Sequence, residues 1–388
     1  MVNQSVYSVL GVGFGPANLS LAVALEEFAY SGRIRFVEKA RCFQRQSELL
    51  LSGTDIQNNP LRDLAMPRNP HSSFTFINYL TAQGKLVAYL HRASKFPLRR
   101  EYAGYLGWAA DAFSRSVDYA RSVTQLALVE GNEGEVWSVE TEDGRRLFGE
   151  TLVIGTGRSP RIPAQLQRHL SSTVFHSTQY LSSIERLQDN DIHVVVVGAS
   201  QSAIEILLDL LERPNIRRVS SVQRGLGFRL KDTSPCSRRV FLPDFVDYFY
   251  PLPYETKKRI RAELRSVNYA ACDQDVIERL ATLQYEYELT GSDRLQLMPY
   301  SEVAEVATHR GVHRLSVRDV NYGTVSAIDA DVVILATGFR DFGVGVDDEW
   351  AHPLFEGMLD RLAVERWRFK LARPIGMCAA SRIREVIA

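Results

Sequence analysis

Apolar residues in the first forty positions follow a strand period, then a helix period, then a strand period again. A short strand over Tyr7-Ser8-Val9-Leu10 is followed by a glycine-rich turn and by apolar residues at helical spacing from Leu19 to Leu25. A second strand, Ile34-Arg35-Phe36-Val37, ends at Glu38. This order of strand, helix and strand predicts a βαβ unit.

The same order returns near the middle of the chain. Val194 to Val197 are all apolar, as in a parallel strand that is buried on both faces, and small residues then lead into an apolar helix from Ile204 to Leu211. Another strand, Val219 to Val222, follows that helix. Two βαβ units predict an α/β fold with two Rossmann-like dinucleotide-binding domains.

The two units also indicate where the domains begin and end. Strands that end in Gly155-Thr156-Gly157 and in Ala336-Thr337-Gly338 lie before and after the second unit. This placement predicts that the second domain, residues 185–325, is inserted into the first, residues 1–165 and 326–388.

Less regular segments lie between these units. An amphipathic helix is expected from about residue 100 to 114, followed by strands to about residue 155. Residues 40–75 and 229–275 show no regular period and are predicted to be irregular. A loop as long as 40–75 in a compact chain usually has a function.

Charge and cysteine content narrow the possible partners. The 46 Lys and Arg residues balance the 46 Asp and Glu residues, and a surface that binds nucleic acid needs a basic excess, so nucleic acid is not expected. The four cysteines form no CxxC pair and no zinc-ligand spacing, so no metal is expected.

The apolar stretches are short. No run of about 18 apolar residues is present, which predicts that the chain has no membrane span. The N-terminus has no basic segment followed by a long apolar one, so no signal peptide is expected. With cysteines that form no disulfide framework, these features favour a cytoplasmic protein.

The glycine-rich turn of the first unit is a candidate dinucleotide site. Gly11 permits a tight turn, Gly13 lets the backbone approach a pyrophosphate, and the helix that follows supplies N–H groups at its start. Glu38 ends the next strand, where a carboxylate can accept hydrogen bonds from ribose hydroxyls. A turn that packing alone requires is the alternative. The candidate cofactor-binding residues are Gly11, Gly13, Gly15, Pro16, Asn18 and Glu38.

The turn of the second unit has small residues in place of most of these glycines. Arg224 comes after the next strand, where an acid would bind a ribose 2′-hydroxyl; a basic residue there favours a 2′-phosphate, and so NADPH over NADH. A solvated surface arginine is the alternative. The candidate cofactor-binding residues here are Gly198, Ser200, Gln201, Ser202, Arg224, Thr337 and Gly338.

Several longer stretches resemble one known family. They include GVGFGPANL at 11–19, LRDLAMPRNPHSSFTFINYL at 61–80, FPLRREYAGYLGW at 96–108 and FVDYFY at 245–250, together with residues 336–339. With these stretches the chain resembles the flavin-dependent N-hydroxylating monooxygenases, which include the ornithine and lysine N-monooxygenases of siderophore biosynthesis. The resemblance spans roughly residues 5 to 340.

The resemblance implies a chemistry. The first domain would bind FAD and the second NADPH, and the reduced flavin would capture O2 as a C4a-hydroperoxide. The distal oxygen would then pass to the neutral primary amine of a small amino acid such as ornithine or lysine, in siderophore or other natural-product biosynthesis. A homotetramer is also implied.

The resemblance assigns substrate and flavin contacts as well. Gln57 would lie near the flavin, and the substrate-binding positions fall on Arg62, Arg238 and Asn268, the last two within a substrate-pocket segment at about 229–280. The family has a lysine at the position of Arg62 and an asparagine at that of Arg238. These guanidiniums suggest a substrate with additional negative charge.

Three acidic residues offer another explanation for these cations. Asp63, Asp232 or Asp247 could pair with Arg62 and Arg238 in a purely structural arrangement. The chain departs from the family at two other places: Arg45-Gln46 replace a Trp-His pair, and no convincing counterpart of the family's His-Gly-Leu-Ser segment follows Phe339. An atypical, shortened C-terminus is therefore expected.

Two other functions stay open on the sequence alone. The chain could be a flavin NAD(P)H oxidase or reductase that does not hydroxylate an amine. It could also be a non-catalytic paralogue. Hydroxylamine formation, amine-independent peroxide formation and failure to retain flavin would distinguish the three.

Overall fold

The structure is a computed structural model that describes residues 5–340, except 93–94, 133 and 269, together with residue 354. The described residues divide into two compact units. The first unit contains Met1–Arg45 and Asp55–Ser159, and the second contains Gln46–Thr54 and Pro160–Arg340. The C-terminal departure expected from the sequence lies outside the described residues, apart from Leu354. That residue packs against apolar side chains of the first unit, so the chain returns there after the second unit.

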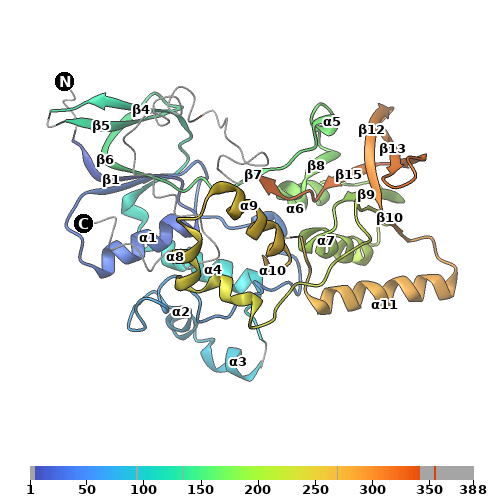
Figure 1. The fold of residues 1–388 in the computed structure, drawn as a ribbon, viewed down its shortest axis with the longest axis horizontal. Coiled ribbons are helices and arrows are strands. Elements are labelled where there is room, and N and C mark those ends of the chain that lie inside the picture. The colour runs from blue at the N-terminus through green and yellow to red at the C-terminus, as the bar shows by residue number, and fades with distance from the viewer. Residues whose placement is uncertain (1–4, 93–94, 133, 269, 341–353, 355–388) are drawn as a thin grey trace. The chain divides into compact units, whose positions relative to one another are not determined.

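The first unit is built on a six-stranded sheet in the order β3-β2-β1-β6-β5-β4 (Figure 1). β1 lies parallel to β2 and β6, and β2 lies parallel to β3. β4, β5 and β6 are antiparallel neighbours. The strands are β1 (Tyr7–Val12), β2 (Ile34–Val37), β3 (Val117–Asp118), β4 (Val123–Glu130), β5 (Glu135–Thr141) and β6 (Arg146–Ile154).

Four α-helices accompany this sheet. Proline at the first helical position fits the start of α1, since proline has no N–H to leave unbonded there. The hydroxyl of Thr75 caps α2 by accepting a hydrogen bond from Asn78 N at 3.2 Å. The helices are α1 (Pro16–Glu27), α2 (Phe76–Ala82), α3 (Leu86–His91), α4 (Arg99–Asp111) and the 3-10 turn η2 (Ser114–Ser116).

An aromatic core holds the helices of the first unit together. The rings of Phe76, Tyr102 and Tyr105 are fully buried, and the Phe76 centroid lies 5.6 Å from that of Tyr102 and 5.4 Å from that of Tyr105. The expected helix at about 100–114 is therefore α4, which supplies Tyr102 and Tyr105 from one face.

The second unit contains a five-stranded parallel sheet in the order β11-β10-β9-β15-β8, and α7 contacts β9 and β10 (Figure 1). A separate antiparallel sheet has the order β12-β13-β14, and β7 pairs with β16. The strands are β7 (Ser159–Pro160), β8 (Val174–His176), β9 (Ile192–Val197), β10 (Ile216–Val222), β11 (Leu295–Met298), β12 (Ser301–His309), β13 (Val312–Asp319), β14 (Val325–Ala330), β15 (Val332–Leu335) and β16 (Phe339–Arg340).

The sheet explains where the second unit ends. β15 pairs with β8 and β9, so residues 332–335 belong to the second unit, which extends to Arg340 rather than to 325 as the sequence suggested. The helices of this unit are η1 (Ser47–Leu49), α5 (Ala164–Gln167), η3 (Ser177–Gln179), α6 (Tyr180–Ile184), α7 (Gln201–Glu212), η4 (Ser237–Phe241), α8 (Pro243–Phe249), α9 (Tyr254–Glu263), α10 (Arg265–Asn268) and α11 (Gln274–Thr290).

The expectation that residues 229–275 are irregular was wrong. The structure places α8, α9 and α10 within this segment. None of the described side chains of α8 and α9 is fully buried, so the segment lacks the apolar stripe by which a helix is recognised in a sequence.

The helices that the structure describes are all too short or too polar to span a membrane.

Candidate functional site

The first glycine turn follows β1 and is closed by backbone contacts. Gly13 has a φ of +83°, and its N–H donates to Val37 O at 2.7 Å. A Cβ at Gly13 would lie 2.6 Å from the carbonyl oxygen of Gly155. Glycine is therefore required at position 13 by the turn itself and by the neighbouring chain.

Gly11 is required for a different reason from the one inferred from the sequence. It lies within β1 rather than in the turn, and a Cβ there would lie 2.2 Å from Cδ1 of Phe36. Gly11 thus allows the Phe36 ring of the neighbouring strand to pack over β1.

Gly15 and Pro16 lie where this turn leads into α1. Gly15 is the N-cap of α1, and a Cβ built on it would meet no atom within 4 Å. The first helical bond runs from Leu19 N to Gly15 O at 2.9 Å, so the N–H groups of Ala17 and Asn18 have no acceptor within the helix. The open space and these donors fit a pyrophosphate.

Glu38 ties the turn to the next strand. Its Oε2 accepts a hydrogen bond from Phe14 N at 2.7 Å, and its Oε1 accepts one from Ala40 N at 2.8 Å. Each oxygen keeps another lone pair, so the carboxylate can also accept from a ribose hydroxyl.

Gln57 lies in the long loop of the first unit with a strained backbone. Its φ is +55°, and its N–H donates to Asp55 Oδ1 at 2.8 Å. A residue other than glycine in this region is uncommon and costs conformational energy, which is often a sign of a functional site.

Arg62 does not pair with its neighbour Asp63. The Asp63 carboxylate is buried and accepts three backbone hydrogen bonds, from Ala65 N, Met66 N and Phe76 N. Burial raises the pKa of Asp63, while these three donors act in the opposite direction. Arg62 is half-buried, and no described carboxylate lies within ion-pair distance of its guanidinium.

The second unit holds the other two substrate candidates. Asp232 accepts hydrogen bonds from Ser234 N at 2.9 Å and from Ser237 Oγ at 2.5 Å, so it does not neutralise Arg238. Arg238 is half-buried in η4, without an ion-pair partner among the described residues. Asn268 is the last residue of α10, and its side chain lies outside the described part of the structure.

The second glycine turn follows β9. A Cβ at Gly198, whose φ is +142°, would lie 2.2 Å from Ala336 O, so glycine is required there. Ser200 is the N-cap of α7, and its side chain makes no capping hydrogen bond. The Gln201 side chain instead links Glu205 Oε1 and Asp273 N, each at 2.9 Å. The Gln201 side chain is therefore engaged within the protein.

Arg224 lies at the end of the neighbouring strand. The register pairs Val222 of β10 with Val197 of β9, so Arg224 and the Gly198 turn lie at the same edge of the sheet. The side chain is exposed, and no described acidic residue pairs with it. This is the position that a 2′-phosphate would require.

Thr337 and Gly338 hold the segment that leaves β15. Thr337 Oγ1 donates to Arg161 O at 2.5 Å, and Gly338 O accepts from Arg161 N at 2.9 Å. The imidazole Nε2 of the buried His176 lies 3.0 Å from the same Gly338 oxygen. The Thr337 side chain is thus engaged within the protein.

Asn18 has a role in the first site that sequence reasoning did not assign. Its side chain is buried and supports the turn from within, through hydrogen bonds to backbone carbonyls. The glycine at the strand end Gly155-Thr156-Gly157 was the signal for this role in the sequence. A side chain at Gly155 would displace Asn18, since a Cβ there would lie 2.5 Å from Asn18 Nδ2.

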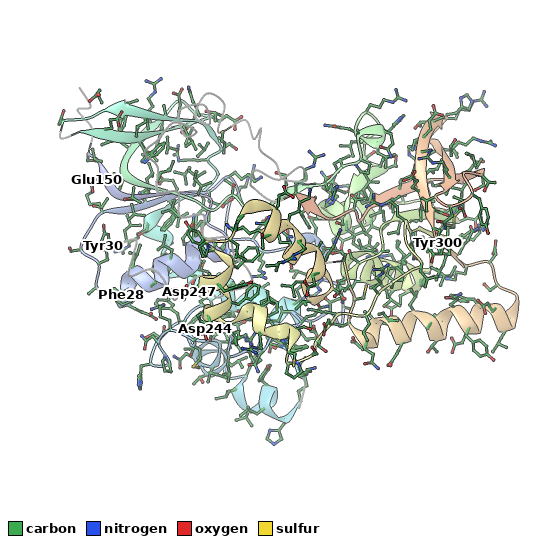
Figure 2. All side chains as sticks on the ribbon, viewed as in Figure 1. Phe28, Tyr30, Glu150, Asp244, Asp247 and Tyr300 are labelled. Carbon is green, nitrogen blue, oxygen red and sulfur yellow. The ribbon has the colours of Figure 1, made fainter. Side chains whose placement is uncertain are left out.

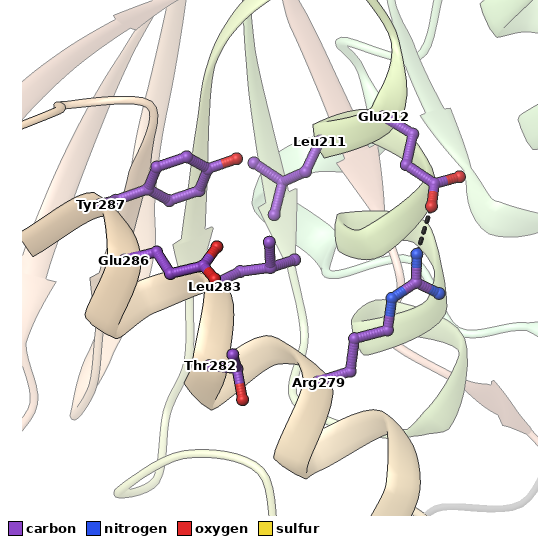
Figure 3. Close-up of a pocket in the computed structure, with 7 residues that line it drawn as sticks. All are labelled: Leu211, Glu212, Arg279, Thr282, Leu283, Glu286 and Tyr287. Atoms are coloured by element: carbon purple, nitrogen blue, oxygen red, sulfur yellow. Dashed lines mark hydrogen bonds and ion pairs between the residues drawn. The ribbon is translucent and has the colours of Figure 1, made fainter. Parts of the chain in front are cut away.

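The structure places the candidates in separate groups. The first turn, Gln57 and Arg62 belong to the first unit, whereas the second turn, Arg238 and Asn268 belong to the second. Figure 3 shows a groove of ≈ 360 Å³ in the second unit. It lies at the C-terminal end of α7, about 16 Å along the helix from Gln201. It is lined by Leu211, Glu212, Arg279, Thr282, Leu283, Glu286 and Tyr287.

Known proteins resemble this chain over most of its length. Residues 5–341 match the family model described as L-lysine 6-monooxygenase/L-ornithine 5-monooxygenase. An L-ornithine N(5)-monooxygenase from Burkholderia cepacia is 33% identical in an alignment of 353 residues that covers 88% of this chain and 80% of that protein. A second, from Pseudomonas aeruginosa, is 31% identical over 86% of this chain and 78% of that protein.

Solved structures agree with this match. The ornithine hydroxylase of P. aeruginosa superposes with a TM-score of 0.83 at 28% identity, covering 92% of this chain and 86% of its own. The ornithine N-hydroxylase of Kutzneria sp. 744 was solved with reduced FAD, NADP+ and L-ornithine. It superposes with a TM-score of 0.81 at 32% identity, covering 86% of this chain and 81% of its own. The chain has the same α/β fold with two Rossmann-like dinucleotide-binding domains. It belongs to the family of L-lysine 6-monooxygenases and L-ornithine 5-monooxygenases.

Proposed function

We propose that this protein is an FAD- and NADPH-dependent monooxygenase that hydroxylates the side-chain amine of a small amino acid such as ornithine or lysine. The overall reaction would be R–NH2 + O2 + NADPH + H+ → R–NHOH + NADP+ + H2O. The observation that carries the proposal is the family match over residues 5–341, and the two turns that have no room for a Cβ at Gly13 and Gly198 support it. An oxidase without amine chemistry and a non-catalytic paralogue are not favoured by this match.

The first turn fits FAD. The pyrophosphate would occupy the open space at Gly15 and accept hydrogen bonds from the N–H groups at the start of α1. Glu38 would accept hydrogen bonds from the ribose hydroxyls. Gln57, held with a positive φ, would lie near the flavin. Bound FAD, once reduced, would activate O2 for the reaction.

The second turn would hold NADPH. The N–H groups at the start of α7 would face its pyrophosphate, and Ser200 and Ser202 offer hydroxyls beside them. Arg224 would pair with the 2′-phosphate as a charge-assisted contact. Thr337 and Gly338 would contribute backbone groups, because the Thr337 hydroxyl already donates to Arg161.

The substrate would be held by cations. Asp63 and Asp232 accept hydrogen bonds from other groups, and neither Arg62 nor Arg238 forms an ion pair with a described acidic residue. Both guanidiniums would bind carboxylates of the substrate. Asn268 would orient the chain that carries the amine. The amine must be neutral to attack, and nearby guanidiniums lower its pKa, which would assist that step.

Further features of the enzyme belong to the same proposal. O2 is the co-substrate, the product enters siderophore or other natural-product biosynthesis, and the protein is a cytoplasmic homotetramer. Size-exclusion chromatography with light scattering tests the tetramer. For the activity, we would measure aerobic NADPH oxidation and hydroxylamine formation with L-ornithine, L-lysine, putrescine and cadaverine. Hydroxylamine from an amino acid supports the proposal, and its absence in flavin-loaded protein contradicts it.

A further inference from the structure

Tyr300 occupies a backbone position that normally belongs to glycine or asparagine. It lies in the turn between β11 and β12, directly after Pro299, and its φ is +49°. Positive φ at this place in a turn favours glycine or asparagine, whereas a bulky aromatic residue is strained. Strain of this kind is retained where the side chain has a use.

The backbone of Tyr300 is fixed without help from its ring. Its N–H donates to Gly225 O at 2.9 Å, and its carbonyl accepts from Val320 N at 2.7 Å. On either side, Ser301 N donates to Gln223 O and Gln223 N donates to Met298 O. The side chain of Tyr300, labelled in Figure 2, is 38% exposed. No hydrogen bond joins its hydroxyl to another described residue. The hydrogen bonds that hold this turn therefore come from the backbone and not from the hydroxyl of Tyr300.

The contact with Gly225 brings Tyr300 beside the loop that carries Arg224. Leu226 follows Gly225 with 70% of its surface exposed, and a Cβ at Gly225 would meet nothing within 4 Å. An exposed cation, an open backbone, an exposed aliphatic side chain and an exposed ring thus lie next to one another.

These groups lie in order along one edge of the sheet. Val222 of β10 is paired with Val197 of β9 on one side and with Met298 of β11 on the other. The Gly198 turn, the Arg224 loop and Tyr300 therefore follow one another across two strand spacings, about 10 Å. In sheets of this type a dinucleotide extends along the carboxyl ends of the strands.

We propose that Tyr300 and Leu226 form the adenine-binding surface of the NADPH site. The inference rests on the proposed use of a nicotinamide dinucleotide. Arg224 binds the 2′-phosphate, and the flat apolar faces of adenine pack against the ring of Tyr300 and the side chain of Leu226. The strained turn fixes the ring at the end of the site farthest from the Gly198 turn.

The test compares Tyr300→Asn with Tyr300→Phe. Asparagine tolerates a positive φ, so Tyr300→Asn removes the ring without adding strain, whereas Tyr300→Phe keeps it. We expect Tyr300→Asn to weaken NADPH and NADH to the same extent, by roughly 5- to 30-fold. The KM for reduced nicotinamide mononucleotide, which has no adenine, should not change. Tyr300→Phe should bind both dinucleotides normally. Tyr322→Asn, at a site that is 86% exposed, is the matched control.

The outcomes separate this inference from the function beneath it. Wild-type protein that binds neither NADPH nor NADH would contradict the proposed function. If the wild type binds NADPH but Tyr300→Asn binds it equally well, the adenine assignment is wrong while the function stands. A lower melting temperature with unchanged nucleotide affinity would show that Tyr300 serves packing, and this too overturns the inference.

Discussion

The side-chain amide of Asn18 donates to the carbonyl oxygen of Gly13 at 2.6 Å, from a position that is only 2% exposed. The same nitrogen lies 3.4 Å from Val12 O. Asn18 therefore supports the first glycine turn through the carbonyl groups of its backbone. This contact connects the start of α1 to the end of β1, so a change at Asn18 should alter both stability and flavin binding.

Asn18→Asp tests the role of this donor. Aspartate has nearly the same size but presents oxygens where Gly13 O needs a donor. Loss of one buried hydrogen bond leaves the acceptor unpaired, at about 1–3 kcal/mol of unfolding free energy. The free energy of unfolding measured in urea and the flavin content of the purified protein should both decrease. Unchanged values of both quantities would show that the contact is unimportant.

Gly15→Asp separates flavin binding from folding. Aspartate is a preferred N-cap residue, and the φ of −79° at Gly15 suits any residue, so the variant should unfold at the wild-type temperature or above. Its carboxylate would fill the space proposed for the pyrophosphate, and flavin content should fall severely. Gly107→Ala, which also meets no atom within 4 Å, is the control that should keep its flavin. A full flavin complement in Gly15→Asp would remove the pyrophosphate from this turn.

Arg62 and Arg238 should control substrate affinity. Arg62→Ala and Arg238→Ala should each raise the KM for an amino acid substrate by about 10- to 150-fold, the value of one charge-assisted contact. Flavin reduction by NADPH without amine should be unaffected. Stopped-flow reduction and steady-state kinetics measure the two effects. A wild-type preference for putrescine or cadaverine over every amino acid would contradict this assignment.

Buried histidines should make the protein less stable in mild acid. Burial lowers the pKa of His193, whose Nε2 lies 2.9 Å from Ser220 Oγ, and the Arg218 guanidinium lowers it further. A lowered folded-state pKa means that the unfolded chain binds the proton first. The contribution of neutral His193 to the free energy of unfolding is complete above the unfolded pKa of 6.5. It is lost as the pH falls below that value toward and through the folded pKa. The free energy of unfolding, measured in urea between about pH 8 and pH 5, should decline as the pH falls, and this decline should be smaller in His193→Gln. An equal decline in His193→Gln would rule out His193 as the cause.

The parts of the fold with strong periodicity could be read from the sequence. The predicted strand 34–37 matches β2 residue for residue, because its apolar residues lie between polar residues at either end. Helices α8 and α9 could not be read, since none of their described side chains is fully buried, and α10 is only four residues long. The sequence also placed 326–335 with the first domain, because pairing of β15 with β8 and β9 is a long-range contact that no local pattern encodes.

The site was predictable in outline and not in its contacts. The glycine pattern located both turns, but it assigned Gly11 to the turn when the Phe36 ring sets that requirement. Charge alone could not show whether Arg62 pairs with Asp63, because the three N–H donors that engage Asp63 come from residues 65, 66 and 76. Tyr300 gave no local signal, since its strain arises from the turn after Pro299 and its contact with Gly225.

The most direct test follows the oxygen atom. Flavin-loaded protein would be incubated with NADPH, isotopically labelled O2 and L-ornithine or L-lysine, and the product analysed by mass spectrometry. The account predicts a side-chain hydroxylamine that carries one labelled oxygen, formed only when the amine, NADPH and O2 are all present. NADPH oxidation at the same rate without amine, with peroxide as the sole oxygen product, would contradict it.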